Sequence, residues 1–420
     1  MLFENIVDIY EISNYIVSMI INKAYKFRLY PDETQKALFA QHFGACRFVY
    51  NIFLRERIDF YATNKGAQKS SLTYADTSRM MTDMKKRSDR EWLKNVNAQS
   101  LQQSLRHLDI AYNNFFNKRA KFPAFKNKQD KQSFLVPQHF KIDVGQGFLS
   151  IPKFTPIKTV FHRSTDGIMK SVNVSMTKSG KYFATILCEI EKEVKPKQSG
   201  PEIGIDLGLK SFVVTSSGEE IPAPKYLRTS QEKLVRFQHR LSRKMKGGNN
   251  RNKARIKVAK IHEKITNQRN DFLHKLSHRL VSENQAIFAE DLNVKGMLAN
   301  HCLAKSISDA GWAEFIRQIK YKSEWNGVCF EQIDRFFPSS KRCFHCGWIN
   351  QSLTLKNREW TCQGCGQIVD RDQNAAQNIL QFGQLSMVRR GSSKPPKRPG
   401  RSRAVRRIAE LGSPLLQMGE

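Results

Sequence analysis

Hydrophobic and polar residues alternate in several short stretches of the first half of the chain, and this period of two predicts β-strands. Between residues 133 and 190 the clearest stretches are 148–151, 172–176 and 182–186. Ser179 and Gly180 supply a hairpin turn between the last two. These strands predict a small β-barrel, which an earlier alternating stretch at 24–30 completes.

Helical periodicity replaces this alternation between residues 34 and 120. Pro31, Asp32 and Glu33 introduce the first helix, with acids suited to its N-terminal turn. The clearest apolar face lies in 97–116, where it is formed by Leu101, Leu105, Leu108, Tyr112 and Phe115. We interpret these five side chains as core packing.

A second architecture follows a linker at 192–201. Four apolar stretches predict its strands, at 202–208, 212–215, 285–290 and 328–333. Between the second and third of them, 229–282 predicts a pair of long basic helices, interrupted at Gly247 and Gly248. The cations on their outer faces fit either a solvated hairpin or a surface that contacts a duplex backbone. A last helix is expected through 374–380.

The charge of the chain indicates a protein that binds polyanions. The 420 residues include 70 Lys and Arg against 38 Asp and Glu, a formal net charge of +32. Cations and aromatic residues interleave at 118–128, a pattern that suits phosphate contact and base stacking as well as it suits a solvated loop. The basic, Pro/Gly/Ser-rich segment 388–420 predicts a disordered tail. No stretch approaches the ~20 apolar residues of a membrane span, so we expect no membrane partner.

The N-terminus and the isolated cysteines bear on the setting of the protein. Residues 1–18 lack the basic start of a signal peptide, and we infer either that translation starts at Met19 or that residues 1–18 are a dispensable extension. Four cysteines in apolar contexts read as buried free thiols in a reducing compartment, namely Cys46, Cys188, Cys302 and Cys329. We therefore expect a cytoplasmic, nucleoid-associated protein.

The other four cysteines form two C-x-x-C pairs, Cys343 with Cys346 and Cys362 with Cys365. Four thiolates in this spacing complete the tetrahedral shell of one structural zinc ion and leave no open position for catalysis. A redox dithiol needs one such pair. The ligands also suit an iron–sulfur cluster, but the ribbon-like spacing favours zinc. His345 lies between two ligands and is not expected to bind the metal.

Three acidic positions stand out. Asp206 lies on a strand face that is otherwise bare, between Gly204 and Gly208, and we expect a substrate to approach there. Glu290 ends an apolar strand, and Asp370 and Asp372 stand at the start of the last helix. Brought together, such acids hold two divalent cations about 4 Å apart for phosphodiester hydrolysis, and magnesium prefers these hard oxygen ligands. Each acid alone is more typical of a cap.

At these residues the sequence resembles the TnpB (OrfB) proteins of bacterial insertion sequences, relatives of type V CRISPR effector nucleases. The matching strings span 204–208, 289–292, 339–347, 362–366 and 370–376, and the start at 25–31 is also similar. The resemblance implies an RNA-guided DNA endonuclease of a transposable element. It also implies that Asp206, Glu290 and Asp372 are the catalytic, magnesium-binding acids, with Asp372 preferred over Asp370. The implied partners are a guide RNA from the element end and target DNA, bound by a protein that is monomeric with its RNA.

The fold that the resemblance implies is multidomain α+β. It has an RNase H-like (RuvC) α/β nuclease core with a zinc-ribbon insert, and the core follows a β-barrel wedge domain that carries a helical recognition insert. The expected boundaries are 1–18 for the extension, 19–31 and 129–198 for the wedge, 32–128 for recognition, 199–340 and 367–387 for the nuclease, 341–366 for the ribbon and 388–420 for the tail.

Two other functions use the same features. A transposase that joins DNA strands itself also uses three acids, so the triad does not discriminate between cutting and joining. A guide-bound protein that binds DNA without cutting it is the third possibility, and the presence of all three acids argues against it.

Overall fold

The structure is a computed structural model that describes residues 17–67, 71–354 and 357–391. The chain divides into two compact units. The first, here the N-terminal unit, comprises 17–193 and 228–267. The C-terminal unit comprises 194–227 and the described residues from 268 onward. Each unit is described by itself.

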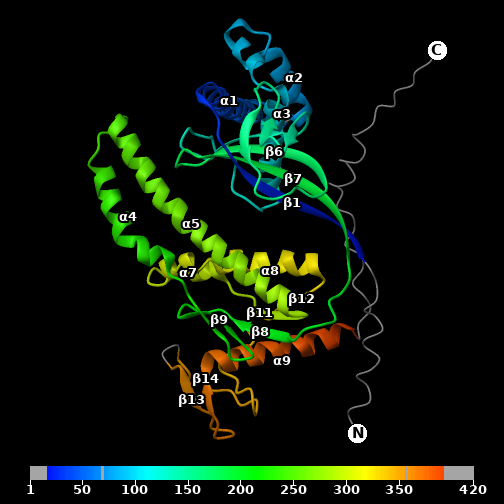
Figure 1. The fold of residues 1–420 in the computed structure, drawn as a ribbon, viewed down its shortest axis with the longest axis vertical. Helices are drawn as coiled ribbons and strands as arrows, with labels where there is room; N and C mark the ends of the chain where they lie inside the picture. Colours follow the sequence, from blue (N-terminus) through cyan, green and yellow to red (C-terminus); the bar gives the residue numbers. More distant parts are fainter. Residues whose placement is uncertain (1–16, 68–70, 355–356, 392–420) are drawn as a thin grey trace, which may run out of the picture. The chain divides into compact units, whose positions relative to one another are not determined.

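A seven-stranded sheet organises the N-terminal unit (Figure 1). Its order is β2-β6-β7-β1-β5-β4-β3, so β1 lies in the middle and the sheet is an open half-barrel rather than the closed barrel expected. Gly180, with φ of 87°, makes the turn between β6 and β7 at the predicted place. The strands are β1 Val17–Leu29, β2 Gln132–Val136, β3 Lys141–Asp143, β4 Phe148–Ser150, β5 Ile157–Val160, β6 Ile168–Met176 and β7 Tyr182–Val194.

Helices pack against this sheet because their apolar faces continue its core. They are α1 Glu33–Thr63, α2 Tyr74–Met84, the 3-10 helix η2 Ser88–Asn95 and α3 Ala98–Phe116. Asp32 caps α1 and forms a capping box with Gln35, as its position before the helix suggests. In α3, Leu101, Leu105 and Leu108 are buried as predicted, whereas Tyr112 and Phe115 are only partly buried.

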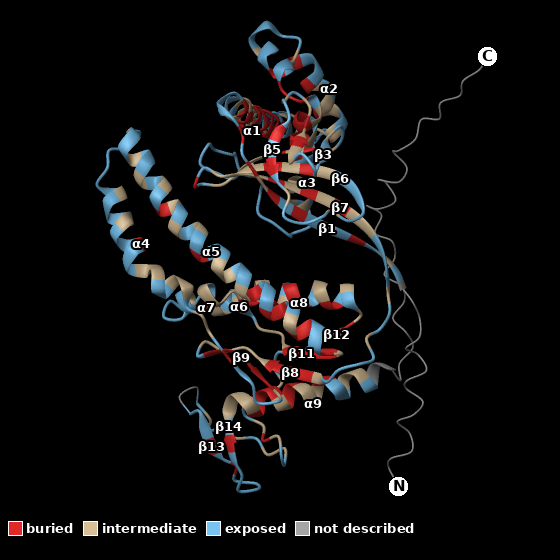
Figure 2. Cartoon of the chain, in the orientation of Figure 1, coloured by how far each residue is buried: buried red, intermediate tan, exposed pale blue. Residues whose placement is uncertain are grey.

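The C-terminal unit is built on a mixed five-stranded sheet of order β10-β9-β8-β11-β12. Its strands are β8 Glu202–Asp206, β9 Ser211–Thr215, β10 Glu220–Pro222, β11 Ala286–Glu290 and β12 Cys329–Ile333. β11 lies between β8 and β12 and is parallel to both. Helices cover the two faces, so the central strands are buried (Figure 2). Four of these strands were predicted, and the short β10 was not.

The helices of this unit lie on opposite faces of the sheet (Figure 1). The C-terminal part of α5 Asn249–Glu283 and α8 Trp312–Asn326 share one core with the sheet, and α9 Arg371–Gly391 packs on the other face. Shorter helices are α6 Val294–Met297 and α7 Ala304–Ala310. Strands β13 Glu359–Thr361 and β14 Ile368–Asp370 form a small hairpin before α9. Within the described ranges, no helix has the length and apolarity to cross a bilayer.

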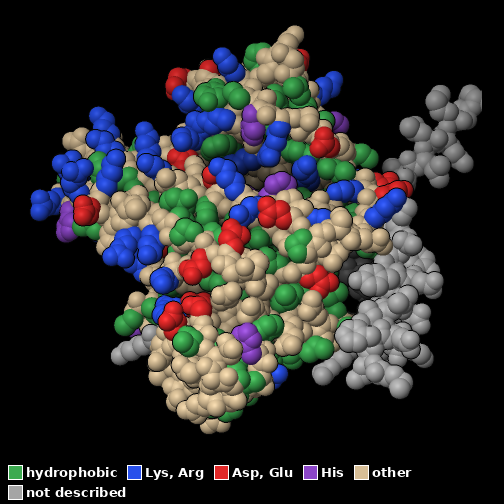
Figure 3. Space-filling view, turned by 60° about the horizontal axis from the view of Figure 1, so that its bottom comes forward, with side chains coloured by type: hydrophobic (Ala, Val, Ile, Leu, Met, Phe, Trp, Pro, Cys, Tyr) green, Lys and Arg blue, Asp and Glu red, His purple; other side chains and the backbone are tan. Residues whose placement is uncertain are grey.

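The predicted basic helical pair is present as α4 Tyr226–Ser242 and α5, with the break at Gly247 and Gly248. The guanidinium of Arg251 donates to the carbonyls of Leu241 and Lys244 and closes the end of the hairpin. Lysines and arginines gather on its exposed faces (Figure 3). Met245, in the break that follows α4, is 81% exposed.

Several expected boundaries shift. β1 begins at Val17, so the last two residues of the expected extension are strand, and 1–16 lie outside the described residues. β7 continues to Val194 and shortens the linker. α9 reaches Gly391, past the expected start of the tail, and 392–420 lie outside the described residues.

The four isolated cysteines do not share one environment. Cys46 and Cys188 are buried as predicted. Cys329 is partly buried, with its thiol 3.8 Å from the Met387 sulfur. The prediction is wrong for Cys302, which is exposed because it lies in the turn between α6 and α7.

Candidate active site and metal centre

Two neighbouring parallel strands carry Asp206 and Glu290 at their C-terminal ends. β8 and β11 pair with Ile205 opposite Ala289, so the next residue of each strand is one of the two acids. Ile205 and Ala289 belong to the core shared with α5 and α8, whereas Phe288 belongs to the core on the α9 face. Because side chains alternate between the two faces of a strand, Asp206 and Glu290 point to the α9 face.

Gly204 lies on that same face, two residues before Asp206. A Cβ atom built on Gly204 would come within 2.2 Å of the Ala376 carbonyl oxygen and 2.6 Å of the Leu380 nitrogen, both backbone atoms of α9. The prediction that this bare strand face admits a substrate is therefore wrong at Gly204, where the missing side chain makes room for the helix. The close approach brings the first turn of α9, with Asp372, towards the strand ends.

Burial and the nearby acids raise the pKa of Asp206 to about 8. Burial is the largest cause, and the negative charges of Glu290 and Asp372 add to it. Arg371 and the N–H of Leu207 oppose the rise. The charges of Glu290 and Asp372 both act on Asp206, so the three predicted acids lie near one another on the α9 face of the sheet.

Glu290 is held by a neighbour that sequence reasoning missed. The Ser339 hydroxyl donates a hydrogen bond to Glu290 Oε1. Burial raises the pKa of Glu290, and the hydroxyl partly offsets the rise. Next to it, Asp291 forms an ion pair with Arg335 at 2.6 Å. One acid of this pair thus faces the site, and the other fastens the segment that follows β12.

The two acids at the start of α9 have different roles in the fold. Asp370 Oδ1 accepts a hydrogen bond of 2.8 Å from the Gln373 N–H, so Asp370 caps the helix. Asp372 forms ion pairs with Arg358 at 2.8 Å and with Arg371 at 2.7 Å. Asp372, and not Asp370, acts on the pKa of Asp206.

The three acids do not form a ready-made cage of oxygens. Among the residues that the structure describes, the one group of three or more metal-ligating side chains with all ligand atoms within 4.8 Å of one another is the cysteine cluster. Asp372 is instead turned toward its two arginines. The donor set is nevertheless the hard, anionic one that divalent magnesium prefers.

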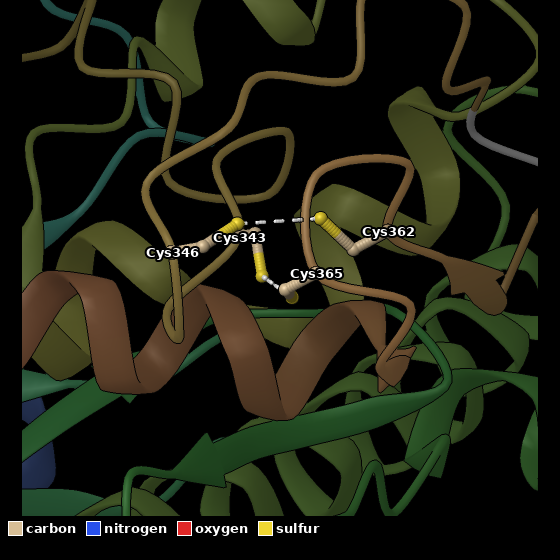
Figure 4. Close-up of side chains that lie close together, drawn as sticks. All are labelled: Cys343, Cys346, Cys362 and Cys365. Carbon is tan, nitrogen blue, oxygen red and sulfur yellow. Dashed lines mark hydrogen bonds between the residues drawn. The ribbon is translucent and has the colours of Figure 1, made fainter.

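The cysteine cluster matches its prediction (Figure 4). The four sulfur atoms of Cys343, Cys346, Cys362 and Cys365 lie within 4.8 Å of one another. Two of the separations are 3.8 Å, for Cys343 and Cys365, and 3.5 Å, for Cys346 and Cys362. A zinc tetrahedron with Zn–S bonds of about 2.3 Å has S···S edges of about 3.8 Å, so the residues fit the ion. His345 is exposed and outside the group.

Two matching turns build this cluster. In the first, the Gly347 N–H donates to the Cys343 carbonyl at 2.9 Å, and in the second the Gly366 N–H donates to the Cys362 carbonyl at 2.8 Å. Both glycines have positive φ, of 78° and 73°, which explains why glycine follows each pair. Desolvation raises the pKa of Cys362, but hydrogen bonds from the N–H groups of Gly364 and Cys365 and from the thiols of Cys346 and Cys365 together bring that pKa to about 7. A thiolate is the form that binds zinc.

Two asparagines fasten the cluster to the α9 face of the site. Asn374 and Asn378 are buried one helical turn apart and donate to the Arg342 carbonyl at 2.7 and 2.6 Å. Asn374 also accepts from the Phe344 N–H at 2.8 Å. The expected last helix, 374–380, contains both asparagines, but no sequence pattern assigned either of them a role. The i, i+4 spacing of two asparagines within an apolar helix face was the signal that could have identified Asn378.

Comparison with known proteins defines the class of this fold. A chain titled "Cryo-EM structure of the Cas12f1-sgRNA-target DNA complex" matches with a TM-score of 0.53 at 13% identity, over 86% of this chain and 98% of that one. The mixed sheet, the half-barrel and the four-cysteine cluster therefore belong to a RuvC-type fold of α+β content.

Relatives and family models then identify the family. Relatives named "Putative RNA-guided DNA endonuclease" in Streptomyces pristinaespiralis and "Putative RNA-guided DNA endonuclease InsQ" in Escherichia coli K12 are 38% and 33% identical. The matches cover 91% and 86% of this chain, and 94% and 92% of those relatives. The chain therefore belongs to the OrfB (TnpB) family of insertion-sequence proteins.

Three family models match parts of the chain. They are described as "Probable transposase" at 185–301, "Cas12f1-like, TNB domain" at 312–379 and "Helix-turn-helix domain" at 19–66. The last of these segments is here a strand followed by one long helix, α1, rather than two helices joined by a turn.

Proposed function

We propose that the protein is an RNA-guided DNA endonuclease that hydrolyses a phosphodiester of its target at Asp206, Glu290 and Asp372. The observation that carries the proposal is the convergence of three acids from separate elements on one face of a RuvC-type sheet. Relatives that bear the name of this activity align over nearly the whole chain.

These residues are suited to bind divalent cations and to keep them at the strand ends. Asp206 and Glu290 supply carboxylates from adjacent strands, and Asp372 supplies one from the helix that packs across them. Ser339 orients Glu290 through its hydrogen bond. When bound there, two magnesium ions supply an activated water and neutralise the charge on the leaving oxygen. The cation charge would also favour the ionised form of Asp206.

The partners that we propose are a guide RNA and a target DNA, with one chain for each RNA. A net charge of +32 suits a partner as large as a structured RNA. Base pairing would select the target, while the protein reads duplex shape and a short adjacent motif. Within this proposal the half-barrel is the wedge domain, α1 to α3 form the recognition domain, and the cysteine cluster binds a structural zinc in a ribbon inserted before α9.

Co-expression of the chain with the DNA that flanks its gene tests the function. We expect a discrete RNA to co-purify and the complex to cut a plasmid that matches this RNA when magnesium is present. Asp206→Ala and Asp372→Ala should abolish cutting. Asp370→Ala is the matched control, because this acid caps the helix and does not act on Asp206, and it should retain most of the activity.

Other results would separate the alternatives. If no discrete RNA co-purifies, the proposal that the nuclease is RNA-guided is wrong. If purified protein joins element ends to a target in place of cutting it, the protein is a transposase. If the guide-loaded protein binds matching DNA without cutting it at any magnesium concentration, it is a binding protein.

A further inference from the structure

An exposed aromatic ring lies in the segment whose neighbouring residues contact the acids at the end of β11. Phe336 is 88% exposed, the highest value among the exposed large apolar side chains of the described chain. It lies in the segment that joins β12 to the first cysteine pair. Core packing therefore does not account for a phenylalanine at this position.

The backbone around Phe336 is held from several sides. The Phe336 N–H donates to Asp334 Oδ1 at 2.7 Å. The ring of Phe337, one residue later, stacks on Phe382 of α9 with a centroid separation of 4.2 Å. Two residues further on, the Ser339 N–H donates to the Phe337 carbonyl at 2.8 Å. These contacts keep the segment in place and leave the Phe336 ring free to meet a partner.

The contacts of the same segment hold its backbone next to the acids on both sides of Phe336. Before it, Arg335 pairs with Asp291 at 2.6 Å and also donates to the Asp291 carbonyl at 3.1 Å. After it, Ser339 donates to Glu290. The ring is thus carried between two residues that hold the adjacent acids at the end of β11. Arg335 keeps part of its cationic side chain in solvent and is suited to a nearby phosphate.

We propose that Phe336 is a positioning residue that stacks on a base of the DNA strand being cut and so sets the scissile phosphate at the carboxylates. The inference rests on the proposed nuclease function. Stacking on an aromatic ring accepts any base, because every base has a π face. A nuclease whose target is chosen by base pairing needs such sequence-tolerant contact at its cutting site.

The test compares three substitutions in the full chain loaded with its co-purified RNA. Phe336→Ala removes the ring, Phe336→Leu keeps an apolar side chain without a π face, and Phe336→Trp keeps the stacking surface. We expect the alanine and leucine variants to cut about 5- to 150-fold more slowly in single-turnover assays, equivalent to about 1–3 kcal/mol for one stacked base. The tryptophan variant should cut at the wild-type rate. Ile168→Ala, which alters a 66% exposed apolar residue of the half-barrel, is the control and should cut normally.

A spectroscopic readout separates stacking from a structural role. 2-Aminopurine placed near the cut position of the target is quenched when it stacks on a ring, and the Asp206→Asn background prevents cutting during the measurement. We expect quenching with Phe336 and Phe336→Trp and its loss with Phe336→Leu, while guide RNA binding stays unchanged.

Two results would overturn this inference and leave the proposed nuclease function in place. One is a Phe336→Leu variant that cuts at the wild-type rate, and the other is fluorescence that is the same with Phe336 and with leucine. A wild-type protein that cuts no target matched to its RNA would overturn the proposed function, and this inference with it.

Discussion

The raised pKa of Asp206 makes a prediction about stability that is independent of any cleavage assay. Replacing the acid by asparagine keeps its shape and removes its charge. At pH 7 the carboxyl is ionised in the unfolded chain but, with a pKa of about 8, mostly protonated in the fold. Folding therefore requires proton uptake that Asp206→Asn avoids, and we expect this variant to be more stable than the wild type when no divalent cation is bound.

The magnitude follows from the shift. The pKa rises from an ordinary 3.8 to about 8, and each unit is worth about 1.36 kcal/mol, so protonation costs about 4 kcal/mol at pH 7. Because Asp206 is partly exposed and the surrounding structure can relax, the real cost of protonation is smaller than this. We therefore expect the free energy of unfolding of Asp206→Asn to be higher than that of the wild type by about 1–3 kcal/mol, and its melting temperature to be a few degrees higher. A raised pKa contributes stability below the unfolded value near 4, and this contribution is lost as the pH rises through about 8. The advantage of asparagine should thus be small at pH 4 and grow up to pH 8.

Thermal unfolding of both proteins from pH 4.5 to 8.5 measures this difference. The buffer should be free of magnesium and of chelators, so that zinc stays bound. Asp59→Asn, which removes the charge of an exposed acid on α1, is the matched control. Added magnesium should raise the melting temperature of the wild type more than that of Asp206→Asn. A difference that is constant with pH, or a less stable Asp206→Asn at pH 7.5, would refute the electrostatic reasoning.

Three further changes test other contacts of the site. Arg358→Ala removes one of the two cations that pair with Asp372 and compete with magnesium for it. The magnesium concentration that gives half of the maximal rise in melting temperature should therefore fall by up to about fivefold, which corresponds to the free energy of one partly exposed ion pair. An unchanged concentration would contradict this. Gly204→Ala places a Cβ against the α9 backbone and should destabilise the protein by about 1–3 kcal/mol in urea unfolding, whereas Gly248→Ala, with no atom closer than 3.5 Å, should not. Cys343→Ser should lose the zinc found by metal analysis, and its cleavage activity should fall more than its RNA binding. An equal loss of both would indicate a global folding role. Cys302→Ser, at an exposed cysteine, is the control.

Periodicity and local chemistry predicted much of this fold. The strands around residues 148–151, 172–176 and 182–186 and the turn at Gly180 were predicted from local alternation and turn chemistry, and the cysteine cluster from a repeated C-x-x-C motif; the structure confirms them. Barrel closure depends on pairing between distant strands, which no local pattern encodes. The sheet is therefore an open half-barrel, although the alternating pattern alone favoured a barrel.

The role of Gly204 could not be predicted for a related reason. A glycine on a strand face indicates close approach of another group, but its sequence does not say which group approaches. A substrate and a helix are equally compatible with a missing side chain. Only the packing of α9 decides between them, and α9 lies more than 160 residues later in the chain. The exposure of Phe336 could not be predicted either, because it depends on how the segment after β12 packs, which no local pattern encodes.

The segment from Arg335 to Cys343 links the carboxylates to the cysteine cluster, and this explains why the two are placed together in the chain. Its first half holds Asp291 and Glu290 through Arg335 and Ser339. Its second half ends in the first cysteine turn and is fastened to α9 by two buried asparagines. The second cysteine pair leads, through β14, into the helix that carries Asp372. Loss of zinc would therefore release constraints on two of the three acids. Asp206 would keep its position, because the close packing of Gly204 on α9 does not depend on the metal.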